Sequence, residues 1–275
     1  MKLRYALPAL ACCLLLAGCA RQADRPDPAE EFTLAEEGVC TLSCGASVDR
    51  WRGDWGDDHY RLPDGTELLW VRAPMGPENV ANGQENVQDL NETARSAVLA
   101  WFEDRGLLYD VEEELERACD LYLHCQETGE RYQEGMVEQT IAPAFSNARI
   151  ICFRTSVTLP LDEPQMVEEI QLETVFDRTT GEVISGWDLF TIPQAEVRAW
   201  VAEHAAPDDP VLRREMEAAL APEWIFLEPE GLSVWFPRGS LPGYESAYGW
   251  FEEYEKAPGT VLQPWVLPEA AEEAE

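Results

Sequence analysis

Lysine is almost absent from this sequence, and positive charge of any kind is scarce. Among 275 residues, 20 are Lys or Arg and 53 are Asp or Glu, so the formal net charge is −33. Lys2 and Lys256 are the two lysines. A surface of this charge repels nucleic acids and anionic lipid headgroups, and it attracts cationic ligands. We therefore expect no nucleic-acid partner, although the same carboxylates also fit an ordinary surface kept soluble by its charge.

Histidine and catalytic motifs are scarce as well. His59, His124 and His204 are the three histidines, and neither Gly-x-Ser-x-Gly nor His-Glu-x-x-His occurs. With 53 acidic residues, chance pairs are expected, so no two carboxylates can be singled out as the catalytic pair of a hydrolase. The sequence therefore predicts no catalytic residue, no cofactor and no metal site. It favours a protein that is not an enzyme.

Long apolar runs are missing after the first twenty residues. Lys2 and Arg4 precede an apolar stretch at 5–17 that is too short to span a bilayer, and Leu-Ala-Gly-Cys follows at 16–19. This order resembles the lipobox of bacterial lipoproteins, which implies cleavage before Cys19 and lipidation of its thiol. We expect a signal peptide at 1–18 and attachment to the outer face of the cytoplasmic membrane through this lipid alone. A plain secretory signal is the alternative.

Five further cysteines lie in a chain expected outside the cytoplasm, where disulfides are permitted. Cys40 and Cys44 flank a short loop and are a candidate disulfide. Cys119 and Cys125 would point about 240° apart on one continuous helix, so they can pair only if the helix ends near Leu123. The spacings match no common zinc site. The odd number leaves at least one thiol free among these five: Cys40, Cys44, Cys119, Cys125 and Cys152.

Polar and apolar patterns divide the rest of the chain. Residues 19–57 are polar and acidic and are expected to form a tether. Residues 58–135 predict a hairpin and then two amphipathic helices, the first capped by Asn86 and ended by Gly106, the second capped by Asp110.

From about Met136 the apolar spacing becomes that of strands, with a turn at Gly181. Helices are expected from Pro193 and Asp209, followed by a second hairpin. The sequence thus predicts an α+β fold, a mostly antiparallel sheet with helices packed on it, in two consecutive α/β modules. The second module is expected at 136–267, with a disordered tail at 268–275.

A set of short motifs in the second module carries a family resemblance. It resembles the C-terminal extracellular domain of RsiV-type anti-sigma factors, a module also found in PdaC-type peptidoglycan deacetylases. The resemblance implies a non-catalytic binding or sensing domain, with a cationic protein such as lysozyme as the first candidate ligand. The matching residues are Phe176-Asp177, Thr180-Gly181-Glu182, Asp188-Leu189-Phe190, Ile225-Phe226-Leu227, Glu230-Gly231-Leu232, Phe236-Pro237, Pro242, Tyr244 and Gly249.

The sequence departs from that family in two respects. Leu161–Met166 stands where members commonly carry a Gly-Gly-Ala-His-Gly type segment. The sequence also has neither the transmembrane helix of an anti-sigma factor nor the metal ligands of a deacetylase. We therefore expect the binding role without the signalling or catalytic parts.

The candidate ligand contacts lie in the aromatic segment near the C-terminus. The resemblance implies that Pro242 and Tyr244 face a ligand, and Tyr248 and Trp250 extend the same aromatic run. Aromatic rings beside carboxylates suit an Arg- or Lys-rich protein, or a sugar. The alternatives are that these rings fill the core of a strand, and that the chain binds or processes peptidoglycan or another cell-wall glycan.

Overall fold

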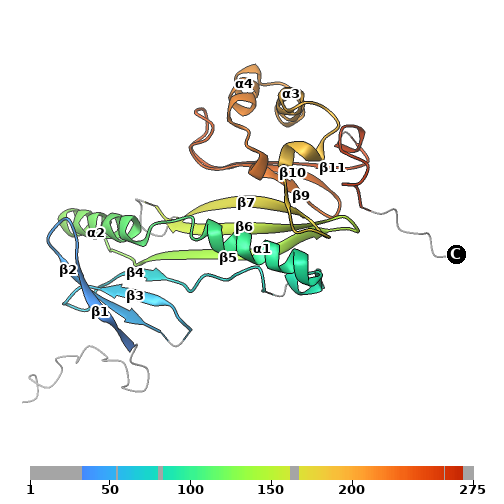
Figure 1. Cartoon of the computed structure of the whole chain (residues 1–275). Coiled ribbons are helices and arrows are strands. Elements are labelled where there is room, and N and C mark those ends of the chain that lie inside the picture. Colours follow the sequence, from blue (N-terminus) through green and yellow to red (C-terminus); the bar gives the residue numbers. More distant parts are fainter. Residues whose placement is uncertain (1–32, 54, 80–82, 162–166, 257, 269–275) are drawn as a thin grey trace, which may run out of the picture.

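The computed structural model describes residues 33–53, 55–79, 83–161, 167–256 and 258–268 (Figure 1). The predicted signal peptide, Cys19, most of the segment at 161–166 and residues 269–275 lie outside the described residues. The fold is α+β, as predicted, with an eight-stranded sheet, a three-stranded sheet and helices packed on both. In the part of the chain that the structure describes, no helix has both the length and the apolar character needed to cross a membrane.

The large sheet follows the order of the chain from its first strand to its eighth. All neighbouring strands are antiparallel except β4 and β5, which are parallel. Parallel neighbours require a crossover, and here it holds α1 (Glu92–Arg105) and α2 (Val111–Thr128). The strands are β1 (Thr33–Thr41), β2 (Ser47–Arg52), β3 (Asp58–Arg61), β4 (Glu67–Val71), β5 (Gly135–Ser146), β6 (Ile150–Pro160), β7 (Val167–Asp177) and β8 (Val183–Ile184).

Residues 33–52 form β1 and β2, although we expected them to belong to the acidic tether. β2 pairs with β1 and with β3, and Val48 is fully buried against Leu115 and Cys119 of α2. Burial of apolar residues on one face of these strands stabilises them even though acidic residues occupy the other positions. The large sheet also continues through residue 135, because β5 begins there and joins the two predicted modules into one sheet.

The middle of the large sheet is buried on both faces. Ile151 and Phe153 of β6 pack against α1, whereas Ile150 and Cys152 face the C-terminal part of the chain. Four consecutive buried residues result, in place of the strict alternation of a strand with one wet face. Further along β6, the positions on the C-terminal side are only half-buried, as at Ser156.

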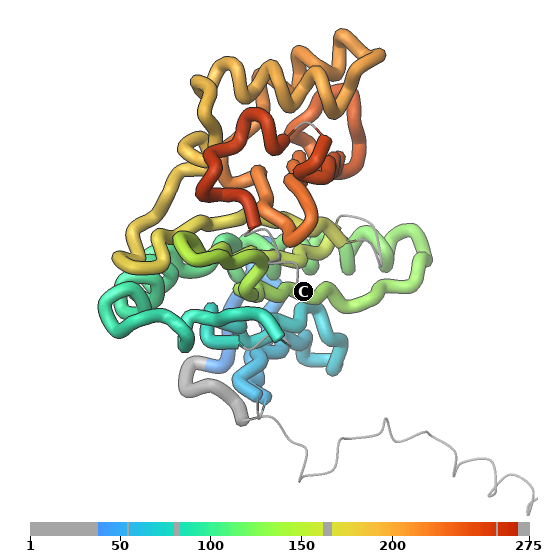
Figure 2. The backbone as a smooth tube through the Cα atoms, turned by 90° about the vertical axis from the view of Figure 1, so that its right-hand side faces the viewer, coloured from blue at the N-terminus to red at the C-terminus, as the bar shows by residue number. Residues whose placement is uncertain are grey.

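The C-terminal part forms a second layer on the large sheet (Figure 2). Its own sheet has the order β11-β10-β9, and the helices α3 and α4 pack on the side away from the large sheet (Figure 1). As predicted, α4 is capped by Asp209, whose carboxylate accepts from two main-chain N–H groups. The elements are α3 (Gln194–Ala205), α4 (Pro210–Ala219), β9 (Ile225–Leu227), β10 (Gly231–Phe236) and β11 (Tyr248–Glu253).

Two helix boundaries differ from expectation. Asn86 does form a capping box with Asp89, but the box closes a single 3-10 turn. Leu90 is extended, so α1 begins afterwards with Asn91 as its cap. α2 continues past Leu123 to Thr128, which leaves Cys119 and Cys125 on one helix, where they do not meet.

The turn between β7 and β8 locks the sheet to α1. Gly181 has a φ of 74° and a Cβ there would lie 2.5 Å from the carbonyl oxygen of Ala94, so only glycine fits. The Asp177 carboxylate accepts from the main-chain N–H groups of Thr179 and Thr180. β8 is only two residues long, and a 3-10 turn at Gly186–Leu189 follows it.

The cysteines are arranged differently from the predicted Cys40–Cys44 pair. The Sγ atom of Cys44, on the turn between β1 and β2, lies 3.0 Å from the Sγ atom of Cys119 on α2. All five described cysteines are free thiols in the structure. Burial and the neighbouring Cys44 raise the pKa of Cys119 to about 12, which disfavours its reactive thiolate form. Cys44 is exposed, so it is the thiol that would react first with a disulfide in solution.

We predict that treatment with a small-molecule disulfide oxidises Cys44 and Cys119 to a disulfide bond with each other. The bond closes a loop of 75 residues, for which chain entropy implies about 4 kcal/mol of stabilisation. Peptide mapping by mass spectrometry under non-reducing conditions should find the linked peptides. Cys44→Ser should lower the melting temperature of the oxidised protein, whereas Cys40→Ser should retain the crosslink. A Cys40–Cys44 peptide in the map would contradict this pairing.

Candidate functional site

The aromatic residues predicted to contact a ligand are largely engaged within the protein. Tyr248 and Trp250 lie on the side of β11 that faces α3. The Tyr248 hydroxyl donates to the carbonyl of Ala205 at 3.0 Å, and the Trp250 ring packs edge-on against Trp200 at 5.8 Å. Tyr244 is half-buried and packs edge-on against Tyr248. These rings therefore hold the layer together, as the core alternative expects.

Pro242 is exposed, as a contact residue must be. The loop that carries it is held in place, because the Gly243 N–H donates to the carboxylate of Glu215 on α4 at 3.1 Å. Of the four predicted contact residues, Pro242 is the one that the structure leaves open to a large partner.

β11 presents a backbone edge that no described strand covers. It is the end strand of the small sheet. The Tyr254 N–H donates to the Glu230 carbonyl across the pair with β10, and backbone direction alternates along a strand. The N–H and C=O groups of Gly249 and Phe251 and the N–H of Glu253 therefore point away from β10. The Glu253 carbonyl is not open, because it accepts from the Lys256 N–H at 3.1 Å.

The side chains along this edge combine one exposed ring with several carboxylates. The Phe251 ring is 48% exposed. Glu253 and Glu255 are exposed, and Glu252 is half-buried. Lys256 lies 3.4 Å from Glu252 and 3.2 Å from Glu253, so it offsets only part of this charge. The edge is thus acidic with one apolar anchor.

A cavity of about 280 Å³ lies between this edge and the large sheet. Phe251 and Trp235 of the small sheet line one side, and Gln171 of β7 lines the other. The indole N–H of Trp235 is buried and has no hydrogen-bond partner among the described residues. The edge therefore continues inward into a partly apolar groove.

A buried ion-pair cluster forms the inner wall of this groove. Arg154 of β6 lies 3.0 Å from the Glu173 carboxylate of β7 and 2.8 Å from that of Glu228. The main-chain N–H of Leu227 donates to Glu173 at 2.7 Å. The guanidinium also stacks on the ring of Phe226 at 4.3 Å. These contacts attach β9 directly to the large sheet.

Glu173 is the most strongly perturbed acid of the cluster. Its side chain is fully buried, and burial raises its pKa to about 7 although Arg154 acts in the opposite direction. A perturbed carboxyl group beside a cavity is typical of functional sites, but it occurs in structural ion-pair networks as well. Here the carboxylate contacts Arg154 on the neighbouring strand of its own sheet and the Leu227 N–H of the second layer, which favours a structural role.

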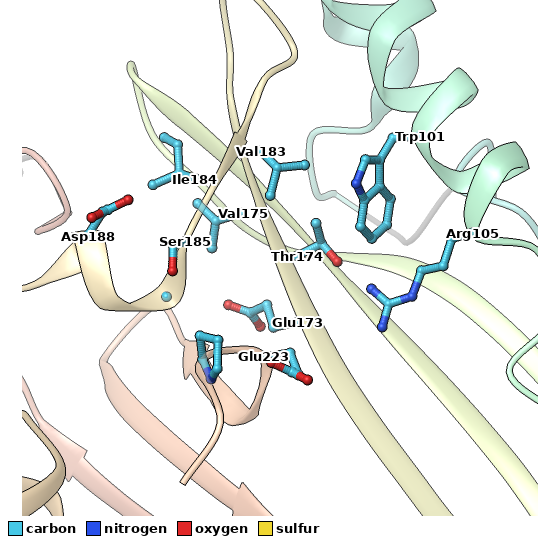
Figure 3. Close-up of a pocket in the computed structure, with 12 residues that line it drawn as sticks. Trp101, Arg105, Glu173, Thr174, Val175, Val183, Ile184, Ser185, Asp188 and Glu223 are labelled. Carbon is cyan, nitrogen blue, oxygen red and sulfur yellow. The ribbon is translucent and has the colours of Figure 1, made fainter. Parts of the chain in front are cut away.

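A second cavity, of about 480 Å³, lies on the other side of Glu173 (Figure 3). It opens where the large sheet, α1 and the C-terminal layer meet. Its size falls within the range of small-molecule sites. Its lining residues are Trp101, Arg105, Glu173, Thr174, Val175, Val183, Ile184, Ser185, Gly186, Asp188, Pro222 and Glu223.

Sequence reasoning did not single out Arg105, Glu173 or Phe251. The described part of the chain also contains no cluster of His, Cys, Asp or Glu suited to a metal ion.

We predict a pH-dependent effect of Glu173→Gln on stability. The pKa of Glu173 is raised to about 7 in the folded protein from an ordinary value of 4.5, so its stabilising contribution is complete below pH 4.5. That contribution is lost as the pH rises through about 7. Glutamine cannot titrate, so the stability of the variant relative to the wild type should increase across this window by up to about 3 kcal/mol.

Urea unfolding of both proteins at several pH values measures this difference. Glu169→Gln, on the exposed part of β7, controls for the removal of one carboxylate from an acidic protein. A difference for Glu173→Gln that does not change with pH would show that the raised pKa is wrong.

Comparison with known proteins gives structural likeness only. No protein-family model and no curated protein matches the sequence. Two solved structures of DUF3298 family proteins are similar to this chain. The one from Bacteroides fragilis has a TM-score of 0.49 and 10% identity, over 86% of this chain and 98% of its own. The one from Pseudomonas aeruginosa has a TM-score of 0.37 and 12% identity, over 87% and 99%.

Proposed function

We propose that this chain is a lipid-anchored extracytoplasmic binding protein, not an enzyme, that captures a cationic protein at the free edge of β11. The observation that carries this proposal is the open backbone of Gly249 and Phe251 and the open N–H of Glu253, beside exposed carboxylates. A free edge pairs with an extended segment of a partner through main-chain hydrogen bonds. The carboxylates make that partner cationic.

Three contacts would act together in such a complex. Main-chain pairing along β11 supplies hydrogen bonds that do not depend on the partner's sequence. The exposed Phe251 ring supplies an apolar anchor, and anchors of this kind carry much of the energy of an interface. The net charge of −33 attracts a cationic partner from a distance and speeds its capture at low salt.

Sequence motifs support both the proposed ligand and the proposed attachment to the membrane. The lipobox ending at Cys19 supports an extracytoplasmic, membrane-attached protein. The resemblance to RsiV-type domains makes lysozyme the first ligand to test. Pro242 remains a candidate contact because it is exposed on a loop held to α4.

We predict that lysozyme binds the full-length protein in detergent and that Glu253→Pro weakens binding about tenfold or more. Proline removes the outward N–H of this edge residue and is tolerated where no neighbouring strand uses that donor. Calorimetric titration at low and moderate salt measures the affinity, which should fall with salt but persist.

Glu253→Gln is the matched control, because it removes the same charge and keeps the N–H group. It should weaken binding less than the proline does. Absence of binding at both salt concentrations would overturn lysozyme as ligand. A folded proline variant that binds like the wild type would overturn the edge as the contact. Retention on purified cell wall instead would support the glycan alternative.

We predict that Cys19→Ala releases the protein from the membrane. The lipid is the expected anchor, so the variant should move to the soluble fraction of the cell envelope and lose incorporation of labelled palmitate. Cys13→Ala serves as the control, because it removes a cysteine within the expected signal peptide. A Cys19→Ala protein that stays in the membrane fraction would contradict the lipoprotein interpretation.

A further inference from the structure

The cavity shown in Figure 3 contains an unpaired stretch of strand backbone. β8 pairs with β7 only at Val175 and Phe176, so the edge of β7 before these residues is open. The Asp177 N–H donates to the Glu182 carbonyl across the same pair. Alternation therefore directs the main-chain N–H and C=O of Glu173 toward the cavity, where no described residue pairs with them.

Arg105 brings a positive charge to the same cavity. It ends α1, and its guanidinium stacks on the Trp101 ring at 4.9 Å. Many described arginines of this acidic chain contact carboxylates or main-chain carbonyls, but Arg105 has neither a hydrogen bond nor an ion pair with any described residue. Burial lowers the pKa of Arg105, whereas the nearby charge of Glu223 acts in the opposite direction. A half-buried guanidinium in this position is available for an anionic group of a ligand.

Acidic and hydroxyl groups complete the lining. Glu223 and Asp188 lie on the walls formed by the 3-10 turns at Pro222–Trp224 and Gly186–Leu189. Thr174 is 5% exposed, and its hydroxyl is buried without a hydrogen-bond partner among the described residues. Figure 3 shows this hydroxyl turned toward Arg105. Besides Glu173, whose carboxylate is held by Arg154, the cavity thus combines a cation, the carboxylates of Glu223 and Asp188, an unsatisfied hydroxyl and a free strand edge.

We propose that this cavity binds the free end of a short peptide or an amino acid, with the ligand's carboxylate on Arg105. The ligand's ammonium group faces Glu223 and Asp188, and its main chain pairs with the open N–H and C=O of Glu173. The cation, the acidic side chains and the open strand edge of the cavity thus match the carboxylate, the ammonium group and the main chain of such a molecule. A purely anionic ligand would meet the two carboxylates, and a purely cationic one would meet Arg105. The site is separate from the β11 edge and does not depend on lysozyme binding.

The test uses alanyl-alanine with free ends as the probe, titrated into the full-length protein in detergent by calorimetry. N-acetyl-alanyl-alanine lacks the ammonium group, and alanyl-alanine amide lacks the carboxylate. We expect the uncapped dipeptide to bind at least about tenfold more tightly than either capped form, because each capped form leaves one charged group of the site unpaired.

Two variants connect the binding to the cavity. Arg105→Gln should weaken binding of the uncapped dipeptide at least about tenfold. Arg149→Gln is the matched control, because Arg149 also stacks on a tryptophan, Trp265, at 4.3 Å, but lies outside this cavity. Thr174→Val removes the unsatisfied hydroxyl and should reduce affinity while the melting temperature stays the same or rises.

Three outcomes would overturn the proposal. These are the absence of binding by the uncapped dipeptide at millimolar concentration, equal binding of free and capped dipeptides, and an Arg105→Gln protein with wild-type melting temperature and affinity. Lysozyme binding measured on Arg105→Gln distinguishes the two sites, because the β11 edge should be unaffected by this change.

Discussion

The Arg154 guanidinium and the Glu173 carboxylate meet between two sheets, where either charge alone would be expensive to bury. The same carboxylate accepts from the Leu227 N–H, so it fixes β9 against the large sheet. β9 pairs with β10, and β10 pairs with β11. This cluster therefore helps to fix the position of the open β11 edge relative to the large sheet. The cluster also separates the groove under β11 from the cavity beside Arg105, so removal of either charge would affect both.

Attachment of the second layer determines which residue types occupy the face of the large sheet that it covers. Where the layer covers β6, residues Ile150 to Phe153 are all buried, and a charged group survives there only as part of the Arg154 cluster. Where the layer ends, Ser156 and its neighbours on that face are polar and half-exposed. The helices on the opposite face run the length of the sheet, and the tight contact of Gly181 with Ala94 fixes α1 at one end.

Strong periodicity and turn chemistry were sufficient to predict most of the elements, such as the turn at Gly181 and the helix capped by Asp209. β1 and β2 were missed because acidic residues hide a short apolar alternation that only burial of Val48 reveals. The candidate site was harder to predict. The alternation of side chains along β11 places Trp250 on one face of the strand. It does not indicate which face another element covers, and in the structure α3 covers the face that carries Trp250. Glu173 looks like any other acid until β6 places Arg154 opposite it, and such a pairing depends on strand register, which local sequence does not determine.

Open strand edges are a hazard, because an edge that accepts another protein's strand can also accept the strand of an identical molecule. The carboxylates around β11, and Glu168 and Glu169 on the uncovered part of β7, oppose this, since a second copy would bring the same charges to the same line. The acidic edge thus opposes self-association through charge repulsion between identical copies. Ions that screen these charges would weaken the repulsion, so the ionic strength of the surrounding solution sets how strongly the edge resists pairing with a second copy.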